Sequence, residues 1–251
     1  MIEPTTNGAR LAARPIVEGG TAVEDWTGWQ RHLPPLDLDG CPALVLVGAH
    51  PDDETLGLGG TAALLRDRGV EVQVVAATDG EAAYPDDDGG RPELAKVRRE
   101  ELVAATSRLG LPKPIFLAVP DGRVASHEQR LSVRLSAVLA GFDRGAWCAA
   151  TWRADGHPDH EAVGRAAAVA AKSTGAVFIE YPIWMWHWAI PDDAAVPWHR
   201  ARRVPLTTAE LSTKAEVMQC FASQLQDGDR PALLTPEVVQ RQMAVGEIVF
   251  V

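Results

Sequence analysis

The chain has few cysteines and no long hydrophobic run. Its three cysteines among 251 residues, Cys41, Cys148 and Cys220, are widely spaced and form no CxxC pattern. Such spacing is typical of reduced, packed residues in an intracellular protein. No apolar stretch reaches the roughly 18 residues that a membrane span needs, and residues 1–20 lack the apolar core of a signal peptide. The sequence therefore predicts a soluble, cytoplasmic protein.

Positive charge is also scarce. The chain has 24 lysines and arginines against 34 aspartates and glutamates, a formal net charge of −10 and an isoelectric point near 5.2. Its basic pairs, Arg98–Arg99 and Arg202–Arg203, are too short to offset this charge on a nucleic-acid surface. We therefore expect no nucleic-acid partner. Nothing in the sequence decides whether the chain forms a homo-oligomer.

From residue 44 onward, β-branched runs alternate with stretches of helical spacing. This alternation predicts an α/β protein with a Rossmann-like three-layer sandwich and a mostly parallel sheet. We expect one domain at 44–251 and an N-terminal extension at 1–43 that packs on this domain or lies flexibly beside it. The expected strands are 44–50, 70–78, 115–119, 147–152 and 177–181, and the expected helices are 23–32, 54–68, 93–109, 128–140, an alanine-rich one ending near 172, and 207–221.

Acids and histidines follow the predicted strands. Because the carboxyl ends of parallel strands meet at one edge of a sheet, we expect these side chains to lie together. Four independent loops that bring such residues to one edge indicate a site, whereas a single histidine on a loop would more often be a surface residue. The residues are His50, Asp52, Asp53, Asp79, Glu81, Asp121, Asp155, His157, Asp159 and His160.

Imidazole and carboxylate groups are good ligands for zinc and similar divalent ions. His50 and Asp53 are three residues apart, so in a helical first turn they would share a face. Asp52 would be rotated by roughly 100° and would face water beside the metal instead. His157 and His160 have the same spacing, which allows one or both to bind. Each aspartate taken singly also suits a helix N-cap, but caps do not explain three histidines.

Two motifs, Ala49-His-Pro-Asp-Asp-Glu54 and Gly156-His-Pro-Asp-His160, resemble those of the PIG-L (LmbE-like) deacetylase family. The resemblance covers roughly residues 44–182. Members of this family are zinc-dependent de-N-acetylases of N-acetylglucosamine conjugates. The resemblance implies a catalytic domain that removes the acetyl group from a small-molecule amino sugar conjugate. It also implies Zn²⁺ as the cofactor, although another divalent metal would suit the same ligands.

The resemblance further implies individual roles. The metal ligands would be His50, Asp53 and His160, the general base Asp52, and a cationic His157 would stabilise the oxyanion. Either Asp52 or His157 would protonate the leaving amine. Arg98 and Asp121 match positions that contact sugar hydroxyls in the family. For Arg98 two alternatives stay open: Arg99 could take its part, or Arg98 could pair with Glu101 on the helix surface.

An aromatic stretch, Tyr181-Pro-Ile-Trp-Met-Trp-His-Trp188, follows the fifth predicted strand. Trp184, Trp186 and Trp188 alternate, so in an extended segment they would share one face. They would then line the substrate cleft, with Trp184 and Trp186 as substrate-binding residues. The alternative is that they cover the sheet edge as part of the core. We do not expect His187 or His199 to bind metal.

Four other functions would use some of the same residues. His50, Asp52 and His160 resemble the two-histidine, one-carboxylate triad of non-haem iron enzymes, whose antiparallel barrels this chain does not predict. Gly57, Gly59 and Gly60 suggest a nucleotide-binding loop but lack GxGxxG spacing. A binding protein without catalysis would not need the full set of acids and histidines. An amidase of the same fold acting on a non-sugar natural product is the alternative nearest to the deacetylase.

Overall fold

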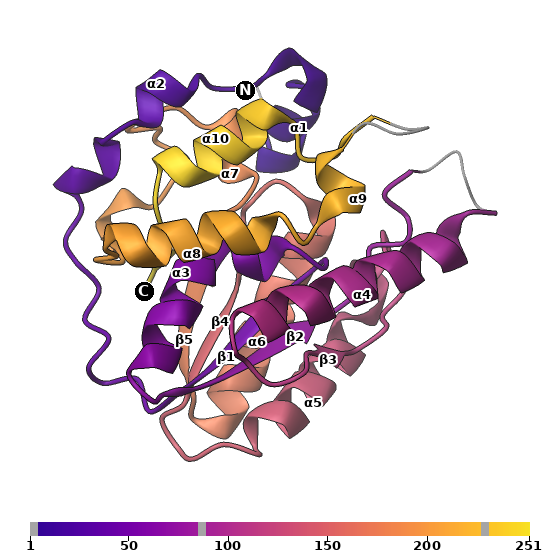
Figure 1. Ribbon diagram of the computed structural model, residues 1–251, viewed down its shortest axis with the longest axis vertical. Helices are drawn as coiled ribbons and strands as arrows, with labels where there is room; N and C mark the ends of the chain where they lie inside the picture. The colour runs from indigo at the N-terminus through magenta and orange to yellow at the C-terminus, as the bar shows by residue number, and fades with distance from the viewer. Residues whose placement is uncertain (1–4, 85–88, 227–230) are drawn as a thin grey trace.

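The computed structural model describes residues 5–84, 89–226 and 231–251 (Figure 1). In these residues a seven-stranded sheet has the order β3-β2-β1-β4-β5-β7-β6. The first five strands in the chain are parallel, whereas β7 is antiparallel to both β5 and β6. The strands are β1 (Ala43–Gly48), β2 (Glu71–Ala76), β3 (Ile115–Phe116), β4 (Trp147–Thr151), β5 (Val177–Tyr181), β6 (Ala201–Arg203) and β7 (Ile248–Phe250).

Helices cover both faces of the sheet. The alternation in β1 shows why, since Val45 and Val47 pack with one set of buried residues and Leu44 and Leu46 with another. The face with Val45 is covered by α5 (Glu128–Leu139) and α6 (Pro158–Thr174). The other face carries α3 (Asp53–Asp67), α4 (Arg91–Arg108) and α8 (Thr208–Met218). The expected three-layer α/β fold with a mostly parallel sheet is confirmed.

The antiparallel edge of the sheet was not among the predicted strands. Strands β6 and β7 have three residues each, too few for a periodic pattern. Strand β3 was expected at 115–119 and ends at Phe116. The expected helix at 23–32 is two short helices, α2 (Val23–Trp26) and η2 (Trp29–His32). Gly28 separates them with a positive φ of 77°, which favours glycine.

The strand order reverses between β1 and β4. From β1 the chain proceeds outward through β2 to β3, while β4 starts the other half of the sheet on the opposite side of β1. In open α/β sheets ligands bind outside the carboxyl ends of the strands at such a switch point. The two histidine motifs follow β1 and β4. The topology thus brings residues about a hundred positions apart to neighbouring strand ends.

The glycines at the start of α3 pack against other elements. A Cβ on Gly57 would collide with the ring of Tyr181, and one on Gly60 would press on Leu206. The backbone nitrogen of Gly60 donates to the buried carboxylate of Glu247, 2.7 Å away. Glu247 also pairs with the buried ammonium of Lys214 at 3.1 Å. These glycines therefore allow close helix packing and do not form a nucleotide-binding loop.

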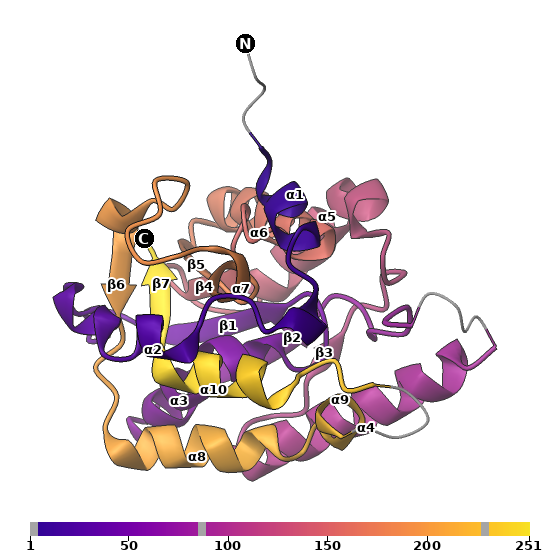
Figure 2. The ribbon, with the colours of Figure 1, turned by 90° about the horizontal axis from the view of Figure 1, so that it is seen from above.

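The described part of residues 1–43 lies against the rest of the chain. It contains α1 (Asn7–Ala12), η1 (Ile16–Glu18), α2 and η2. The indole of Trp26 is fully buried and donates to the carbonyl of Trp186 at 3.1 Å. In Figures 1 and 2, α1 and α2 lie at the same end of the molecule as α7 (Met185–Trp188), α9 (Ala222–Leu225) and α10 (Pro236–Ala244). Residues 1–4 lie outside the described part. No helix among the described residues is long and apolar enough to cross a membrane.

Candidate active site

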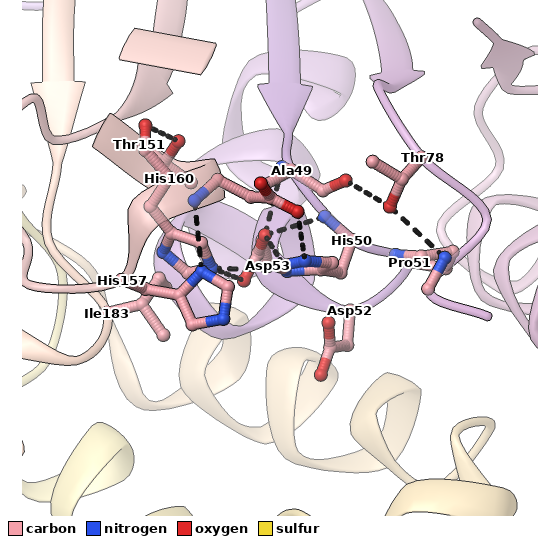
Figure 3. Close-up of polar contacts among 12 residues, drawn as sticks. Ala49, His50, Pro51, Asp52, Asp53, Thr78, Thr151, His157, His160 and Ile183 are labelled. Carbon is pink, nitrogen blue, oxygen red and sulfur yellow. Dashed lines mark hydrogen bonds and ion pairs between the residues drawn. The ribbon is translucent and has the colours of Figure 1, made fainter. Parts of the chain in front are cut away.

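The two histidine motifs meet at the carboxyl ends of β1 and β4. The connection from β1 to α3 carries the first motif, and the connection from β4 into α6 carries the second. Figure 3 shows the rings of His50, His157 and His160 gathered around Asp53, while the carboxylate of Asp52 points away from them. The expectation that the motifs share one edge of the sheet agrees with this arrangement.

The backbone at Asp52 separates the two adjacent carboxylates. Helix α3 begins at Asp53, and Asp52 precedes it with a φ of 149°, a conformation that L-residues rarely adopt. His50 also lies before the helix. The expected helical first turn is therefore wrong, although the two aspartates do point in different directions. An unusual backbone conformation produces this divergence, rather than rotation around a helix.

The nitrogens of two imidazoles and the carboxylate of Asp53 lie close together. The His160 Nε2 atom lies 3.2 Å from His50 Nδ1 and 3.4 Å from Asp53 Oδ1. The His50 Nδ1 atom lies 3.6 Å from Asp53 Oδ2. Zinc bonds of about 2.0–2.1 Å in a tetrahedron hold neighbouring ligand atoms about 3.3 Å apart. The spacing of these atoms therefore fits a zinc-sized ion.

The far nitrogen of each of these two imidazoles faces a carboxylate. His160 Nδ1 lies 2.8 Å from Asp155 Oδ2, and His50 Nε2 lies 3.1 Å from Asp121 Oδ1. Metal-binding histidines almost always donate their second N–H in this way, which fixes the tautomer and directs the free nitrogen at the ion. Asp155 is fully buried and also accepts backbone N–H groups of residues 183, 184 and 185.

The charges around the donor atoms favour a cation. Burial acts to raise the pKa of Asp53, but His160 and His50 outweigh it and hold that pKa below its usual range. Burial acts to lower the pKa of His50, but neighbouring carboxylates, Asp121 foremost, raise it well above 6.5. A site whose carboxylates stabilise a proton so strongly also attracts a metal ion. The donor set and its surroundings therefore suit a divalent metal.

Asp52 is a buried carboxylate beside this centre. It is 5% exposed, and its Oδ1 lies 3.8 Å from the Arg98 guanidinium. Burial raises the pKa of Asp52 to about 7, the charge of Asp53 acts in the same direction, and Arg98 opposes both. A carboxylate with a raised pKa is suited to accept a proton near neutral pH and to return it.

His157 differs from the expected cation. Burial lowers its pKa well below 6.5, and His160 and His50 act in the same direction. Its Nδ1 accepts the backbone N–H of Asp159 at 3.3 Å, so the proton of the neutral ring lies on Nε2. This lowered pKa favours the neutral ring over the expected cation, because burial and two neighbouring imidazoles disfavour the charge. One nitrogen of His157 lies within 4.8 Å of nitrogens on His50 and His160, so the geometry alone admits a fourth ligand.

Arg98 is held inside the protein. It is 3% exposed and donates to the carbonyl of Gly80 at 2.7 Å and to Oε1 of Gln224. The carboxylate of Glu101 instead accepts hydrogen bonds from the backbone N–H and the hydroxyl of Ser223. The alternative pair of Arg98 and Glu101 on the helix surface is therefore wrong. Arg99 lies on the outside of α4, paired with Asp79 at 3.0 Å. Both Arg98 and Asp121 line the cavity described next, where a substrate contact stays a prediction.

A cavity of about 420 Å³ opens in front of these residues. The acids and histidines form one part of its lining, here called the polar end, and apolar residues form another part, here called the apolar end. Most of the apolar residues come from the N-terminal segment, from the segment after β5 and from the segment before α10. The lining residues are Leu11, Ala12, Arg14, Pro15, Ile16, His50, Asp52, Asp53, Leu56, Ala82, Ala83, Arg98, Asp121, Gly122, His157, Ile183, Trp184, Gln224, Leu233 and Leu234.

The aromatic stretch does not form the expected extended segment. It contains the one-turn helix α7, so the tryptophans do not share a face. Trp184 lines the cavity, which agrees with a contact to substrate. Trp186 is 2% exposed and packs edge-on against Trp26, with ring centroids 5.0 Å apart. The prediction that Trp186 binds substrate is wrong, because three successive aspartate-bound amides turn the chain into a helix.

Several residues of the site received no role from the sequence. Asp155 and Asp159 were recognised only as members of a cluster, although Asp159 anchors the backbone of Gly122 at 2.7 Å. Gln224 links Arg98 to the carbonyl of Pro51, which its Nε2 approaches to 2.7 Å. The sequence indicated that the two aspartates belong to the site, because both follow the strand β4. Gln224 and the apolar residues at 11–16 and 233–234 had no such signal, because they lie far from both motifs in the chain.

The fold and the site define an α/β protein with a candidate metal centre at the switch point of its sheet. Residues 45–171 match the model of the PIG-L family, described as GlcNAc-PI de-N-acetylase, and the chain belongs to this family. A relative from Rhodococcus opacus is named 1D-myo-inositol 2-acetamido-2-deoxy-alpha-D-glucopyranoside deacetylase. It is 30% identical over 214 residues, which cover 74% of this chain and 68% of the relative.

Solved structures share the fold. A deacetylase triple mutant of the teicoplanin biosynthetic pathway has a TM-score of 0.65 at 18% identity, covering 83% of this chain and 96% of its own. The N,N'-diacetylchitobiose deacetylase of Pyrococcus horikoshii has a TM-score of 0.60 at 22% identity, covering 76% and 75%. At these identities the similarity shows the fold alone.

Proposed function

We propose that the chain is a metal-dependent hydrolase that removes the acetyl group from an N-acetyl amino sugar conjugate. The products are acetate and the free amine. The observation that carries this proposal is that His50 Nδ1, His160 Nε2 and the carboxylate of Asp53 lie close together beside the buried Asp52. Membership of the PIG-L family and the relative's amino sugar substrate support it.

His50, Asp53 and His160 would hold the metal, and zinc fits their nitrogen and oxygen atoms. When bound there, zinc supplies Lewis acidity to water and to the amide carbonyl. The carboxylates of Asp121 and Asp155 would keep the two imidazoles in the tautomers that ligation needs.

Asp52 would be the general base. Its carboxylate lies beside the proposed metal ligands and takes the proton of the attacking water. His157, with its proton on Nε2, would donate a hydrogen bond to the oxygen that becomes negative in the transition state. The neutral ring of His157 makes Asp52 the better proton donor to the leaving amine. The same carboxyl group would thus carry the proton from water to nitrogen.

Arg98, Asp121 and Trp184 would contact the sugar or its substituent, since all three line the cavity. Arg98 would also act on the base, because its positive charge 3.8 Å from Asp52 favours the ionised form of that carboxylate. Asp121 likewise serves both His50 and the cavity.

Two alternatives are less well supported. A non-haem iron enzyme would use a similar triad, but the PIG-L match and the position of Asp52 outside the donor cluster favour hydrolysis. An amidase acting on a non-sugar natural product would use the same chemistry with another substrate.

The test measures metal content and acetate release together. We expect the purified protein to contain about one zinc or similar ion per chain and to release acetate from N-acetylglucosamine conjugates. Chelation should abolish the activity, and added zinc should restore it. A protein with no divalent metal and no amidase activity on sugar conjugates would refute the proposal. Activity only on non-sugar amides would select the second alternative.

A further inference from the structure

The apolar end of the cavity is built largely by residues outside the family match. The N-terminal segment contributes Leu11, Ala12, Arg14, Pro15 and Ile16 to the lining, and the segment before α10 contributes Leu233 and Leu234. Arg14 is the charged member of this set, and its guanidinium donates to the hydroxyl of Thr21 at 2.7 Å. The PIG-L match spans residues 45–171. The shared family region therefore accounts for the polar end, whereas this wall belongs to other parts of the chain.

Side chains of the rest of the protein hold the N-terminal segment by hydrogen bonds to its backbone carbonyls. Arg241 is 2% exposed and donates through Nε to the carbonyl of Thr21 at 2.7 Å and through Nη2 to that of Gly19. The Nε2 atom of His187 lies 2.8 Å from the carbonyl of Arg14. His187 Nδ1 in turn lies 3.2 Å from Arg241 Nη1.

Helix α1 is held at its other end as well. The side chain of Asn7 donates to the carbonyl of Ala154 at 2.8 Å. Ala154 precedes Asp155, whose carboxylate faces His160. The guanidinium of Arg10 pairs with Asp193 and lies 4.3 Å above the ring of Trp188. These contacts hold the N-terminal segment against the body of the protein, so Leu11, Pro15 and Ile16 stay in the lining of the cavity.

We propose that this N-terminal segment is a specificity element that binds an apolar substituent of the substrate. The inference rests on the proposed deacetylase function and adds the substrate class: amino sugar amides that carry an apolar group. The group extends from the polar end, where the amide is hydrolysed, and lies against Ile16, Leu11 and Trp184. Burial of apolar surface provides the preference. The group can belong to the aglycone or to the acyl chain, and the experiment distinguishes these sources.

The first measurement compares three substrates with the unmodified protein. They are the methyl glycoside of N-acetylglucosamine, its hexyl glycoside, and the methyl glycoside of N-hexanoylglucosamine. We expect kcat/KM to rise at least about tenfold for one elongated substrate. A gain with the hexyl glycoside assigns the wall to the aglycone, and a gain with the hexanoyl amide assigns it to the acyl chain. Equal values for all three overturn the inference, whereas no hydrolysis of any refutes the proposed function instead.

The second measurement uses a matched pair of variants. Ile16 lines the cavity, while its neighbour Val17 is 82% exposed and does not. Ile16→Asn should lower the preference for the elongated over the methyl substrate about fivefold, and Val17→Asn should leave it unchanged. Thermal unfolding checks that both variants are folded. If Ile16→Asn does not fold, Leu11→Ala replaces it, with an expected loss of about twofold. Equal preferences in the folded variants would show that the segment does not contact the substrate.

Discussion

The two ends of the cavity differ in how the chain builds them. The polar end comes from two short motifs that follow neighbouring parallel strands, and all its groups are tied to each other by hydrogen bonds and ion pairs. The apolar end comes from three segments near residues 11–16, 183–184 and 233–234. Reaction chemistry needs atoms fixed to within a fraction of an ångström, which strand ends provide. Apolar binding needs only a surface of suitable shape.

Asp155 connects the two ends. One carboxylate oxygen faces His160 Nδ1, and the same side chain accepts the backbone amides of residues 183–185. The proposed metal ligand His160 and the backbone of Trp184 are therefore positioned by one buried group. This connection suggests that substitutions at the polar end divide into those that change chemistry alone and those that change both ends.

Replacing Asp52 should have the largest effect on the reaction rate, and it should leave substrate preference unchanged. Asp52→Ala removes the proposed base, so we expect kcat to fall by about 10²–10⁴-fold for every substrate alike. The metal content should stay nearly unchanged, because Asp52 lies outside the proposed set of metal ligands. Rate assays with metal analysis check both points, and Asp52→Asn serves as the variant of similar shape. Loss of metal from Asp52→Ala would contradict the division of roles between the two aspartates.

Replacing Asp155 should affect both ends. Asp155→Asn removes the charge that holds His160 Nδ1, so we expect metal affinity to fall about 10–100-fold. Any preference for elongated substrates should fall as well, since the backbone N–H of Trp184 loses the carboxylate oxygen to which it donates. Competition with a chelator measures the affinity, and His160→Ala gives the result of losing the ligand itself. The surface variant Asp39→Asn is the control. Unchanged metal affinity in Asp155→Asn would show that His160 is oriented without it.

The tryptophans give the smallest effect on catalysis and test the apolar end alone. Trp184→Ala should raise KM a few-fold for bulky conjugates and leave kcat nearly unchanged, because only a wall of the cavity is removed. Trp186→Ala should instead lower the free energy of unfolding by about 3–5 kcal/mol, because its ring fills the core. Steady-state kinetics and denaturant unfolding separate the two. An equal rise of KM in both folded variants would place Trp186 in the substrate path.

The elements with strong periodicity were predictable. Strand β5 was expected at its observed bounds, and α3, α5 and α8 were expected to within about three residues. The short elements were not, since β6 and β7 form only because they pair with each other and with β5. The prediction of an extended aromatic stretch was wrong for a similar reason. Its alternation favours an extended chain, but Asp155 binds its amides and the local turn becomes helical.

The sequence alone determined the fold class and the set of acids and histidines, because alternating periodicity selects a parallel sheet and such a sheet collects its strand ends at one edge. Only the tertiary structure decided the burial that lowers the pKa of His157, the backbone that turns Asp52 away from Asp53, and the apolar part of the cavity lining. These features depend on burial and on contacts between segments far apart in the chain. Local spacing carries no information about such contacts.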